Sequence, residues 1–332
     1  MATVRWRTDV FRLMQQLFFK RSCQEAEEFI RRSKIPSRVG DGSIIVTFDK
    51  TPLPSSPNDV VCPHFVELKW ATGCRFNCSW CYLQGTLFRL PYGKAPHFKD
   101  IGKVKKHLKI FLAEVDTPCL LNSGELCDSL VAEGSEFSLT RNYLPLLSGT
   151  PHRILIVTKD TRIQGILEHG SPKTTVVSIS INAFNVAERW ERGAPPVLER
   201  IQAAQKLYES GFEIRVRIDP MVPVEGWQKA YQEVVRVLLQ RVQPSRITLG
   251  SLRGLASTIR ACRDKSWVKY LSERSNWGLK VPFSVRLDMY RSIIDFLREQ
   301  GYQGPVALCK ETLRMWNALG LNWLEIKCNC IP

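Results

Sequence analysis

The sequence predicts an α/β fold with a parallel sheet, arranged as a partial TIM barrel of the (β/α)6 type. From Phe65 onward, short apolar runs alternate with longer amphipathic stretches, an order typical of strand–helix–strand units. Six such units follow one another, which suits a partial barrel. Because ligands in such folds bind at the carboxyl ends of the strands, the residues that follow each strand are the candidates for a site.

The predicted elements alternate regularly along the chain. The strands are predicted at 65–70, 118–122, 153–158, 174–181, 213–218 and 246–249. The helices between them are predicted at 101–115, 138–147, 161–169, 196–210 and 228–241. Residues 1–60 are predicted to form a basic helical extension over 1–36 and a linker with a short strand at 43–48. The core barrel would then occupy 61–255, with a cysteine-bearing C-terminal extension over 256–332.

Composition describes an ordinary globular protein with an unusual charge. Apolar residues make up 44% and charged residues 24% of the 332 residues, and no apolar run approaches the roughly 20 residues that span a bilayer. Eleven cysteines without a secretion-signal pattern indicate metal binding in a reducing compartment, so we expect a cytoplasmic protein without a membrane partner. The formal net charge of +15 fits a nucleic-acid partner, although charge spread for solubility would give the same sum.

The most specific motif directly follows the first predicted strand. Cys74, Cys78 and Cys81 are separated by three and then two residues, and Gly73 allows a sharp turn before them. Three thiolates at this spacing can bind a [4Fe–4S] cluster and leave one iron with an open coordination position. That iron can bind the amino and carboxylate groups of S-adenosylmethionine (SAM), whose reductive cleavage gives a 5′-deoxyadenosyl radical. A zinc or four-cysteine structural site with a distant fourth ligand is the alternative.

Polar residues at the ends of the next predicted strands extend this site. Glu125 follows the second strand, behind Gly124, and its carboxylate can accept a hydrogen bond from the amino group of a bound methionine moiety. Lys159 follows the third strand and can contact a carboxylate or a ribose, and Ser180 lies near the end of the fourth. Each residue alone also fits a solvated or helix-capping role, so the prediction rests on their occurrence at successive strand ends.

These residues resemble those of the spore photoproduct lyase family of radical SAM enzymes. The similarity begins near residue 65, includes the stretch from Ala71 to Gln84, and continues to about residue 250. Further similar segments, in the same order, are Val157-Thr-Lys159, Ser180-Ile-Asn182-Ala183, Arg200-Ile-Gln-Ala-Ala204 and Glu225-Gly-Trp227 with Tyr231. The cysteine motif is highly specific for radical SAM enzymes, and the longer pattern is moderately specific for the lyase-like branch.

The resemblance implies a barrel of the radical SAM type, a [4Fe–4S] cluster and SAM. The implied cluster ligands are Cys74, Cys78 and Cys81, and the implied SAM contacts are Glu125, Lys159 and Ser180. We also expect a reductase partner such as flavodoxin or ferredoxin. Tyr82 matches a tyrosine that helps to relay a hydrogen atom in the lyase. Glu125 aligns with the lyase's hydrogen-donor cysteine, and Cys127, two residues later, is the candidate to replace it. Trp80 stands where the lyase has a second tyrosine, which leaves reversal of a thymine photoproduct open.

Cysteines outside the motif predict a second metal site. Cys309, Cys328 and Cys330 lie near the end of the chain, and Cys62 precedes the first predicted strand. Four soft ligands suit a second iron–sulfur cluster, zinc is also compatible with them, and a set of reactive or buried thiols is the alternative. Three other cysteines are expected to be structural or ordinary buried thiols: Cys23, Cys119 and Cys262.

Three functions therefore fit the sequence. The favoured one is a lyase-like radical SAM enzyme that abstracts a hydrogen atom from a nucleic-acid base or sugar, with a DNA photolesion as candidate substrate. The second is radical SAM modification of a peptide or small metabolite, and the third is a non-enzymatic, metal-bearing nucleic-acid-binding protein. Interleaved aromatic and basic residues fit either base stacking or core packing: Phe88-Arg89, Tyr92 with Lys94, Trp190 with Arg192, Trp267 with Lys269-Tyr270, and Trp277 with Lys280.

Overall fold

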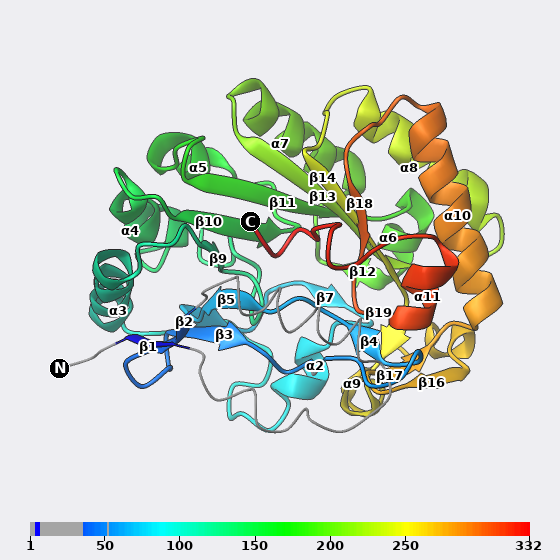
Figure 1. The fold of residues 1–332 in the computed structure, drawn as a ribbon, viewed down its shortest axis with the longest axis horizontal. Coiled ribbons are helices and arrows are strands. Elements are labelled where there is room, and N and C mark those ends of the chain that lie inside the picture. Colours follow the sequence, from blue (N-terminus) through cyan, green and yellow to red (C-terminus); the bar gives the residue numbers. More distant parts are fainter. Residues whose placement is uncertain (1–3, 7–35, 52) are drawn as a thin grey trace.

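A single ten-stranded sheet is the framework of residues 4–6, 36–51 and 53–332, the part of the chain that the computed structural model describes. In spatial order its strands are β1 (Val4–Trp6), β2 (Pro36–Val39), β3 (Ile45–Phe48), β5 (Phe65–Leu68), β9 (Leu120–Asn122), β10 (Arg153–Thr158), β11 (Thr175–Ile181), β13 (Glu213–Met221), β14 (Arg246–Ser251) and β18 (Val306–Leu308). The sheet curves around the centre of the molecule, with its N-terminal strands and the strands β10 to β13 on opposite sides (Figure 1).

The strands from β5 to β18 run parallel to their neighbours, so the predicted α/β fold with a parallel sheet is confirmed. Six of them correspond to predicted strands, and β10 does so residue for residue. Every residue of β11 is buried, as expected for a parallel strand that is covered on both faces. The strand β18 comes from the segment predicted as a C-terminal extension, and that segment therefore contributes to the sheet itself.

Three antiparallel strands extend the sheet beyond β5. The strand β3 pairs with β5, with Ile45 opposite Leu68, and matches the short strand predicted at 43–48. The strands β2 and β1 follow outward. Residues 4–6 thus form a strand where a helix was predicted, because pairing with β2 overrides a local helical pattern. Residues 7–35 of the predicted helical segment, with Cys23, lie outside the described residues.

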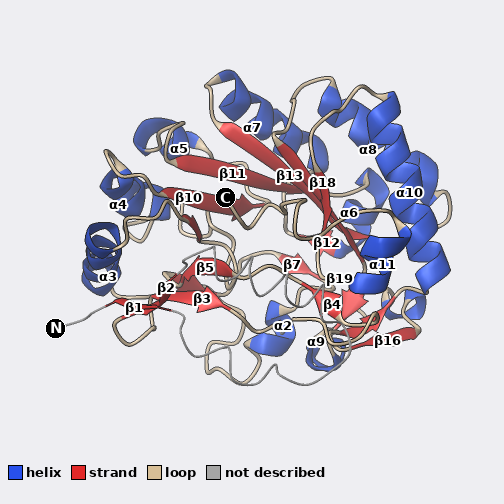
Figure 2. Ribbon diagram, viewed as in Figure 1, coloured by secondary structure: helices blue, strands red, loops and turns tan. Residues whose placement is uncertain are grey.

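Helices cover the outer face of the parallel strands (Figure 2). They are α3 (Ile101–Glu114), α4 (Leu139–Tyr143), α5 (Gln164–His169), α6 (Phe184–Trp190), α7 (Val197–Glu209), α8 (Trp227–Leu239) and α10 (Phe283–Glu299). Four predicted helices correspond to α3, α5, α7 and α8. The helix predicted at 138–147 divides into α4 and a 3-10 turn, η2 (Leu144–Leu147), where Pro145 lacks the N–H that a continuous helix needs. The helices α6 and α10 were not predicted.

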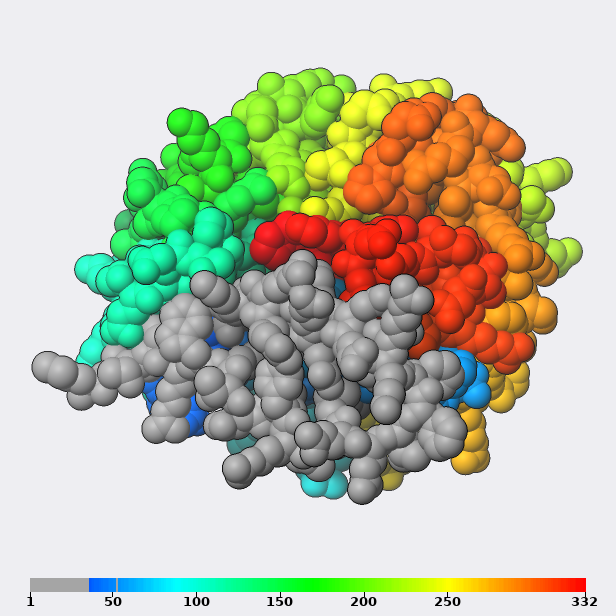
Figure 3. Space-filling view, in the orientation of Figure 1, coloured from blue at the N-terminus to red at the C-terminus, as the bar shows by residue number. Residues whose placement is uncertain are grey.

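Short strand pairs and turns organise the loops at the carboxyl ends of the strands. The pairs are β4 (Val60–Val61) with β19 (Glu311–Thr312), β6 (Ala71–Thr72) with β8 (His97–Phe98), β7 (Asn77–Cys78) with β12 (Glu191–Arg192), and β17 (Gly278–Lys280) with β15 (Arg253–Gly254) and β16 (Glu273–Ser275). The remaining helices are α2 (Leu83–Thr86), α9 (Ala256–Ala261), η3 (Val268–Tyr270) and α11 (Leu313–Ala318). The C-terminal segment, in red, lies across one face of the molecule (Figure 3).

Apolar side chains of the strands and their covering helices form one large buried cluster. Trp190 and Trp267 are fully buried in it, so these two aromatics pack the core and do not stack on bases. Phe88, by contrast, is 54% exposed. None of the helices in the described ranges has the length and apolar character needed to cross a bilayer.

Candidate functional site

The three motif cysteines lie on the loop that follows β5, as the sequence predicted. The loop begins with a turn at Gly73, whose φ is +87°. A Cβ atom at this position would approach the carbonyl oxygen of Ala95 to 2.3 Å, so only glycine fits. Further along, the sulfur of Cys74 accepts a hydrogen bond from the backbone N–H of Phe76 at 3.4 Å. The turn therefore sets the direction in which the cysteines leave the sheet.

Three contacts hold this loop against the rest of the molecule. The guanidinium of Arg75 pairs with the carboxylate of Asp160, which lies just after β10, at 2.8 Å. The side-chain amide of Gln84 donates to the carbonyl oxygen of Cys78 at 2.7 Å. The backbone of Cys78 also pairs with that of Glu191 in the β7–β12 ladder. The positions of the thiols are thus coupled to the ends of the parallel strands.

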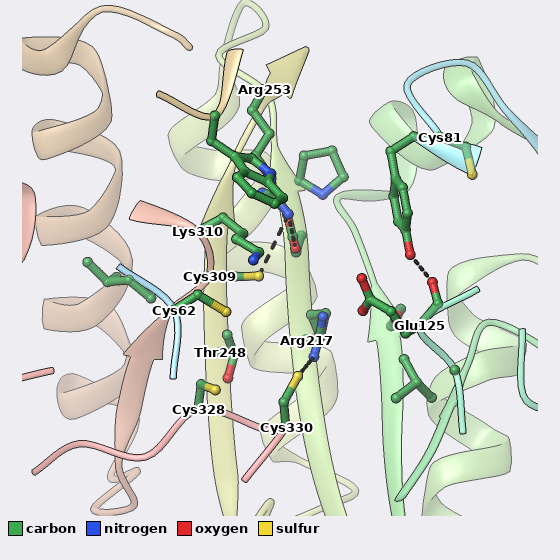
Figure 4. A pocket seen from close by; sticks show the side chains of 18 of the residues that line it. Cys62, Cys81, Glu125, Arg217, Thr248, Arg253, Cys309, Lys310, Cys328 and Cys330 are labelled. Atoms are coloured by element: carbon green, nitrogen blue, oxygen red, sulfur yellow. Dashed lines mark hydrogen bonds and ion pairs between the residues drawn. The ribbon is translucent and has the colours of Figure 1, made fainter. Parts of the chain in front are cut away.

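A cavity of about 270 Å³ lies at the carboxyl ends of the parallel strands. Figure 4 shows Cys81 and Glu125 on one wall, and Cys62, Cys309, Cys328 and Cys330 on the other. The predicted site residues that line it are Cys62, Cys78, Cys81, Tyr82, Glu125, Lys159, Ser180, Cys309, Cys328 and Cys330. Cys74 and Cys127 are not among the lining residues. The cavity wall therefore brings together all three predicted SAM contacts, two of the three motif cysteines and the four cysteines of the predicted second site.

Lys159 is held in place by a buried carboxylate that the sequence did not single out. Its ammonium nitrogen lies 3.6 Å from Glu191, whose other carboxylate oxygen accepts from Arg200 at 2.6 Å. Arg200 also donates to the carbonyl oxygen of Ser180 at 3.2 Å. Burial opposes ionisation of Glu191, but Lys159 and Arg200 outweigh it and lower its pKa. The result is an ionised network beneath two of the predicted SAM contacts.

The same network includes Asn182 and Tyr231, which belong to two further segments on which the family resemblance rests. The side-chain amide of Asn182 donates to the carbonyl oxygen of Pro220 at 2.9 Å and lies 3.4 Å from Glu191. Tyr231, which is fully buried, donates its hydroxyl hydrogen to the amide oxygen of Asn182 at 2.8 Å. Asn182 and Tyr231 thus position the ends of β11 and β13 without facing the cavity.

Glu125 lies on the cavity wall opposite the C-terminal cysteines. Its burial, together with the nearby carboxylate of Glu67, raises its pKa to about 8, against the opposing effect of Lys310. Its backbone carbonyl accepts a hydrogen bond from the hydroxyl of Tyr82. Cys127 is buried next to this wall, and its sulfur lies 3.5 Å from the carbonyl oxygen of Ser123. Tyr82 therefore contacts the loop that carries both Glu125 and Cys127.

Trp80, at a position where the family resemblance implies a tyrosine, lines the cavity. It is 8% exposed, and its ring packs against that of Trp190 at a centroid distance of 5.7 Å. The indole N–H of Trp190 donates to the hydroxyl of Ser266 at 2.8 Å. Trp80 is therefore part of a packed aromatic pair.

The C-terminal cysteines face the cavity beside two guanidinium groups. Arg217 donates to the sulfur of Cys330 at 3.1 Å, and Arg253 to the sulfur of Cys309 at 3.7 Å. Arg253 is itself held by Asp219 at 2.8 Å. The cations on this wall were not assigned a role from the sequence, although Arg217 and Asp219 lie at the end of a predicted strand.

The motif cysteines fit an iron–sulfur cluster by their chemistry. All ten cysteines of the described ranges are free. Burial raises the pKa of Cys78 to about 12, against the opposing effect of Lys159, and Glu191 and the thiols of Cys81 and Cys74 add to the rise. No three His, Cys, Asp or Glu side chains in the described part of the chain converge on the position of one metal ion. A [4Fe–4S] cluster makes a different demand, because each thiolate binds its own iron.

Two other cysteines behave as the sequence predicted. Cys119 and Cys262 are buried and do not line the cavity. The sulfur of Cys119 lies 3.2 Å from the carbonyl oxygen of Thr117. The sulfur of Cys262 lies 3.5 Å from that of Ile259. Both thiols are therefore satisfied locally.

Comparison with known proteins gives a consistent result. The chain is 25% identical over 173 residues to spore photoproduct lyase of Bacillus subtilis (strain 168), a match that covers 52% of this chain and 50% of the relative. It is 23% identical over 175 residues to the lyase of Geobacillus sp. (strain Y412MC61), with the same shares covered. The chain thus spans about half the length of the curated relatives that it matches.

Solved structures of the lyase share the fold. Spore photoproduct lyase complexed with dinucleoside spore photoproduct matches with a TM-score of 0.62 and 18% identity, over 73% of this chain and 75% of that one. A variant of the lyase with bound AdoMet and dinucleoside spore photoproduct matches with a TM-score of 0.61 and 18% identity, over 78% and 77% of the two chains. The family model described as spore photoproduct lyase matches residues 66–250, more than half of the sequence. The chain therefore belongs to the spore photoproduct lyase family.

Proposed function

We propose that this chain is a lyase-like radical SAM enzyme whose curved sheet is a partial TIM barrel. The observation that carries the proposal is the single cavity lined by Cys78, Cys81, Glu125, Lys159 and Ser180. Sequence spacing and the family assignment support Cys74 as the third cluster ligand. A [4Fe–4S] cluster with bound SAM would supply a 5′-deoxyadenosyl radical after one-electron reduction. Everything else in the reaction depends on how the residues of this chain hold SAM and substrate.

The residues of the cavity are suited to positioning SAM. The Lys159 ammonium, oriented by Glu191, can bind a carboxylate or a ribose hydroxyl. Ser180 lies beside it on the next strand. The carboxylate of Glu125 can accept a hydrogen bond from the amino group of SAM. Burial favours the protonated form of Glu125. The hydrogen bond from the SAM amino group would favour its ionised form instead.

A nucleic-acid substrate is the favoured proposal. Lys159, Arg217, Arg253 and Lys310 line the cavity, while Glu125 and Asp219 are the carboxylates on its wall. The net charge of +15 agrees with a polyanionic partner. We propose a hydrogen-atom relay through Tyr82 and Cys127, supported by the contact of Tyr82 with the Glu125–Cys127 loop. Repair of a DNA photolesion is the specific candidate, with Trp80 as the main difference from the lyase.

We also propose an external electron donor of the flavodoxin or ferredoxin type, because the proposed cleavage consumes one electron. The free cysteines of the described ranges favour a cytoplasmic location. The group of Cys62, Cys309, Cys328 and Cys330 is proposed as a second metal site on the opposite wall of the cavity. This second group also supports the alternative function, radical modification of a peptide or a small metabolite.

The test is SAM cleavage by the anaerobically reconstituted protein. With dithionite and SAM we expect 5′-deoxyadenosine, detected chromatographically, and a visible absorption band typical of an iron–sulfur cluster. Cys78→Ala should abolish the product, whereas Cys119→Ala, outside the cavity, should retain it. Absence of both cluster and product in the wild type would refute the proposal, and zinc at the motif would favour a non-enzymatic binding protein.

The substrate class is tested separately by the salt dependence of DNA binding. For a nucleic-acid enzyme the logarithm of the association constant falls linearly with the logarithm of salt concentration, with a slope set by the number of phosphate contacts. A slope near zero would remove nucleic acid and favour the peptide or metabolite alternative.

A further inference from the structure

Four cysteines from distant parts of the chain meet on one wall of the cavity. Cys62 follows β4, Cys309 follows β18, and Cys328 and Cys330 lie in the C-terminal segment. Figure 4 shows their sulfur atoms grouped around Thr248, with Cys81 and Glu125 across the cavity. This group is separate from the motif cysteines, and all four of its members lie outside residues 66–250, the range that the family model matches.

The first two cysteines are brought together by a short strand pair. In the β4–β19 ladder Val61 lies opposite Glu311, so the antiparallel register places Cys62 opposite Lys310 and beside Cys309. Glu311 is fully buried and anchors this strand, since its carboxylate pairs with Arg286 and with Lys280, the latter at 3.2 Å. A buried, charge-compensated anchor thus fixes the position of these two thiols.

The other two cysteines are positioned by the residue between them. The side chain of Asn329 is fully buried and contacts residues of β11, β13 and β14. Its amide group donates to the hydroxyl of Ser178 at 3.0 Å and to the carbonyl of Val216 at 2.9 Å. Its amide oxygen accepts from Thr248 at 2.8 Å, and the Thr248 hydroxyl oxygen accepts from its backbone N–H at 3.0 Å. Asn329 therefore fixes the turn from which Cys328 and Cys330 face the cavity.

Two arginines, the buried Arg215 and the partly buried Arg246, hold the backbone of the same segment. Arg215 donates to the carbonyl oxygens of Asn329 at 2.9 Å and of Ile331 at 2.7 Å. Arg246 donates to the carbonyl oxygens of Cys328 at 2.7 Å and of Ile331 at 2.9 Å. These donors satisfy carbonyl groups that have no partner in a helix or strand, and they hold the segment in one conformation. The four thiols are thus held by a built site and do not lie on a loose chain end.

We propose that Cys62, Cys309, Cys328 and Cys330 bind a second [4Fe–4S] cluster. Four cysteine thiolates are the usual ligand set of such a cluster. The set is complete, so every iron has a protein ligand and none is open to substrate. The cluster is therefore an electron-transfer or structural centre, in contrast to the motif cluster with its three cysteines. Its assembly requires only these four thiols, and it would form whether or not the motif cysteines support SAM cleavage.

The surrounding cations fit a negatively charged cluster. A [4Fe–4S] core with four thiolates carries a net negative charge, and hydrogen bonds to the sulfurs raise its reduction potential. Arg217 donates to Cys330 and Arg253 to Cys309. Lys310 lies opposite Cys62 in the register of the β4–β19 pair, and its ammonium is 4.1 Å from the centre of the Trp277 ring. Three of the four ligands thus have a cationic neighbour.

The first test is metal content after anaerobic reconstitution. The wild type should bind about eight irons and eight sulfides, and the triple variant Cys309→Ala/Cys328→Ala/Cys330→Ala about four of each. The motif variant Cys74→Ala/Cys78→Ala/Cys81→Ala should also keep about four, although it loses SAM cleavage. The matched control Cys119→Ala/Cys262→Ala removes two buried thiols outside the cavity and should keep the full count.

Several outcomes would overturn the proposal. An iron content of about four in the wild type would do so, as would zinc bound at these cysteines or an unchanged count in the C-terminal triple variant. Circular dichroism shows whether each variant folds, and electron paramagnetic resonance of the reduced wild type gives an answer even if a variant does not. Two distinct cluster signals are expected, and one signal would contradict a second cluster.

The second test addresses the arginine contacts. In the motif variant, where the second cluster is the one that remains, Arg217→Gln should shift its midpoint potential to a more negative value. Arg241→Gln serves as the control, since Arg241 donates to the carbonyl oxygen of Val237 and does not line the cavity. An unchanged potential in Arg217→Gln would show that the guanidinium does not contact a cluster ligand.

Discussion

The carboxylate of Glu191 lies 3.6 Å from the ammonium nitrogen of Lys159, and the backbone of Glu191 pairs with that of Cys78. One buried residue thus joins the cysteine loop to a predicted SAM contact. Its second carboxylate oxygen is engaged by Arg200 at 2.6 Å. Loss of its charge would leave two buried cations without compensation, and it would free Lys159 within the cavity.

Glu191→Gln is therefore expected to lower both stability and SAM affinity. Removing one member of a buried ion pair costs about 3 kcal/mol of unfolding free energy, because the remaining charge stays buried. Urea denaturation measures the first effect, and anaerobic calorimetric titration with SAM measures the second. Glu188→Gln, the same substitution at an exposed position of the preceding helix α6, should change neither. Equal SAM affinity in Glu191→Gln and wild type would contradict the positioning role.

The raised pKa of Glu125 predicts that the protein loses stability as the pH rises. Its pKa is raised from an ordinary value of 4.5 to about 8, so the folded state holds the proton more tightly than the unfolded state between these values. The free energy of unfolding should fall with pH across this window in the absence of SAM. Glu125→Gln removes the effect and should be more stable than the wild type above pH 8, with little difference below pH 4.5. Thermal unfolding across the window checks this, and parallel profiles for the two proteins would refute it.

The lowered pKa of Glu213 predicts that the protein loses stability as the pH falls into the acid range. Burial opposes its ionisation, but Arg215 and Arg153 outweigh this and lower its pKa from 4.5 to about 2. Its contribution to stability is complete above pH 4.5 and is lost as the pH falls towards 2. Glu213→Gln should cost about 1 kcal/mol at neutral pH, since the pair is partly screened by solvent, and the difference should vanish at low pH. Glu213 lies at the start of β13, away from the cavity, so SAM cleavage should be unaffected.

Asn329→Ala tests the fixed conformation of the C-terminal segment. The substitution removes the acceptor of the buried Thr248 hydroxyl hydrogen and the side-chain hydrogen bond to the carbonyl of Val216, at a cost of about 2 kcal/mol. We expect a lower melting temperature and an iron content reduced to about four, because Cys328 and Cys330 lose their fixed positions. Asn322→Ala is the control, since Asn322 is exposed in the same segment and its side chain contacts Glu325 and the backbone N–H of Leu324, both local partners. A full iron count in Asn329→Ala would show that the turn is not needed for cluster binding.

Much of the fold follows from local sequence pattern. The strand β10 has its predicted limits because an apolar run between polar turns specifies a buried parallel strand on its own. The helix α10 carried a similar signal that was not used, since its buried residues Met289, Tyr290, Ile293 and Phe296 recur at helical spacing. Residues 4–6 could not be predicted in this way, because they form a strand only through pairing with β2.

The candidate site also has some features that follow from local sequence and others that depend on tertiary contacts. The spacing of Cys74, Cys78 and Cys81 and the turn at Gly73 are local features, so the sequence by itself determined the cysteine loop and the chemistry it can support. Only the tertiary structure decided that Glu191 supports Lys159. It also decided that Cys62 meets Cys309 through a strand pair, and that Asn329 directs two more thiols into the same cavity. These contacts join residues far apart in the chain, and the strand register and side-chain burial that create them exist only once the sheet has formed.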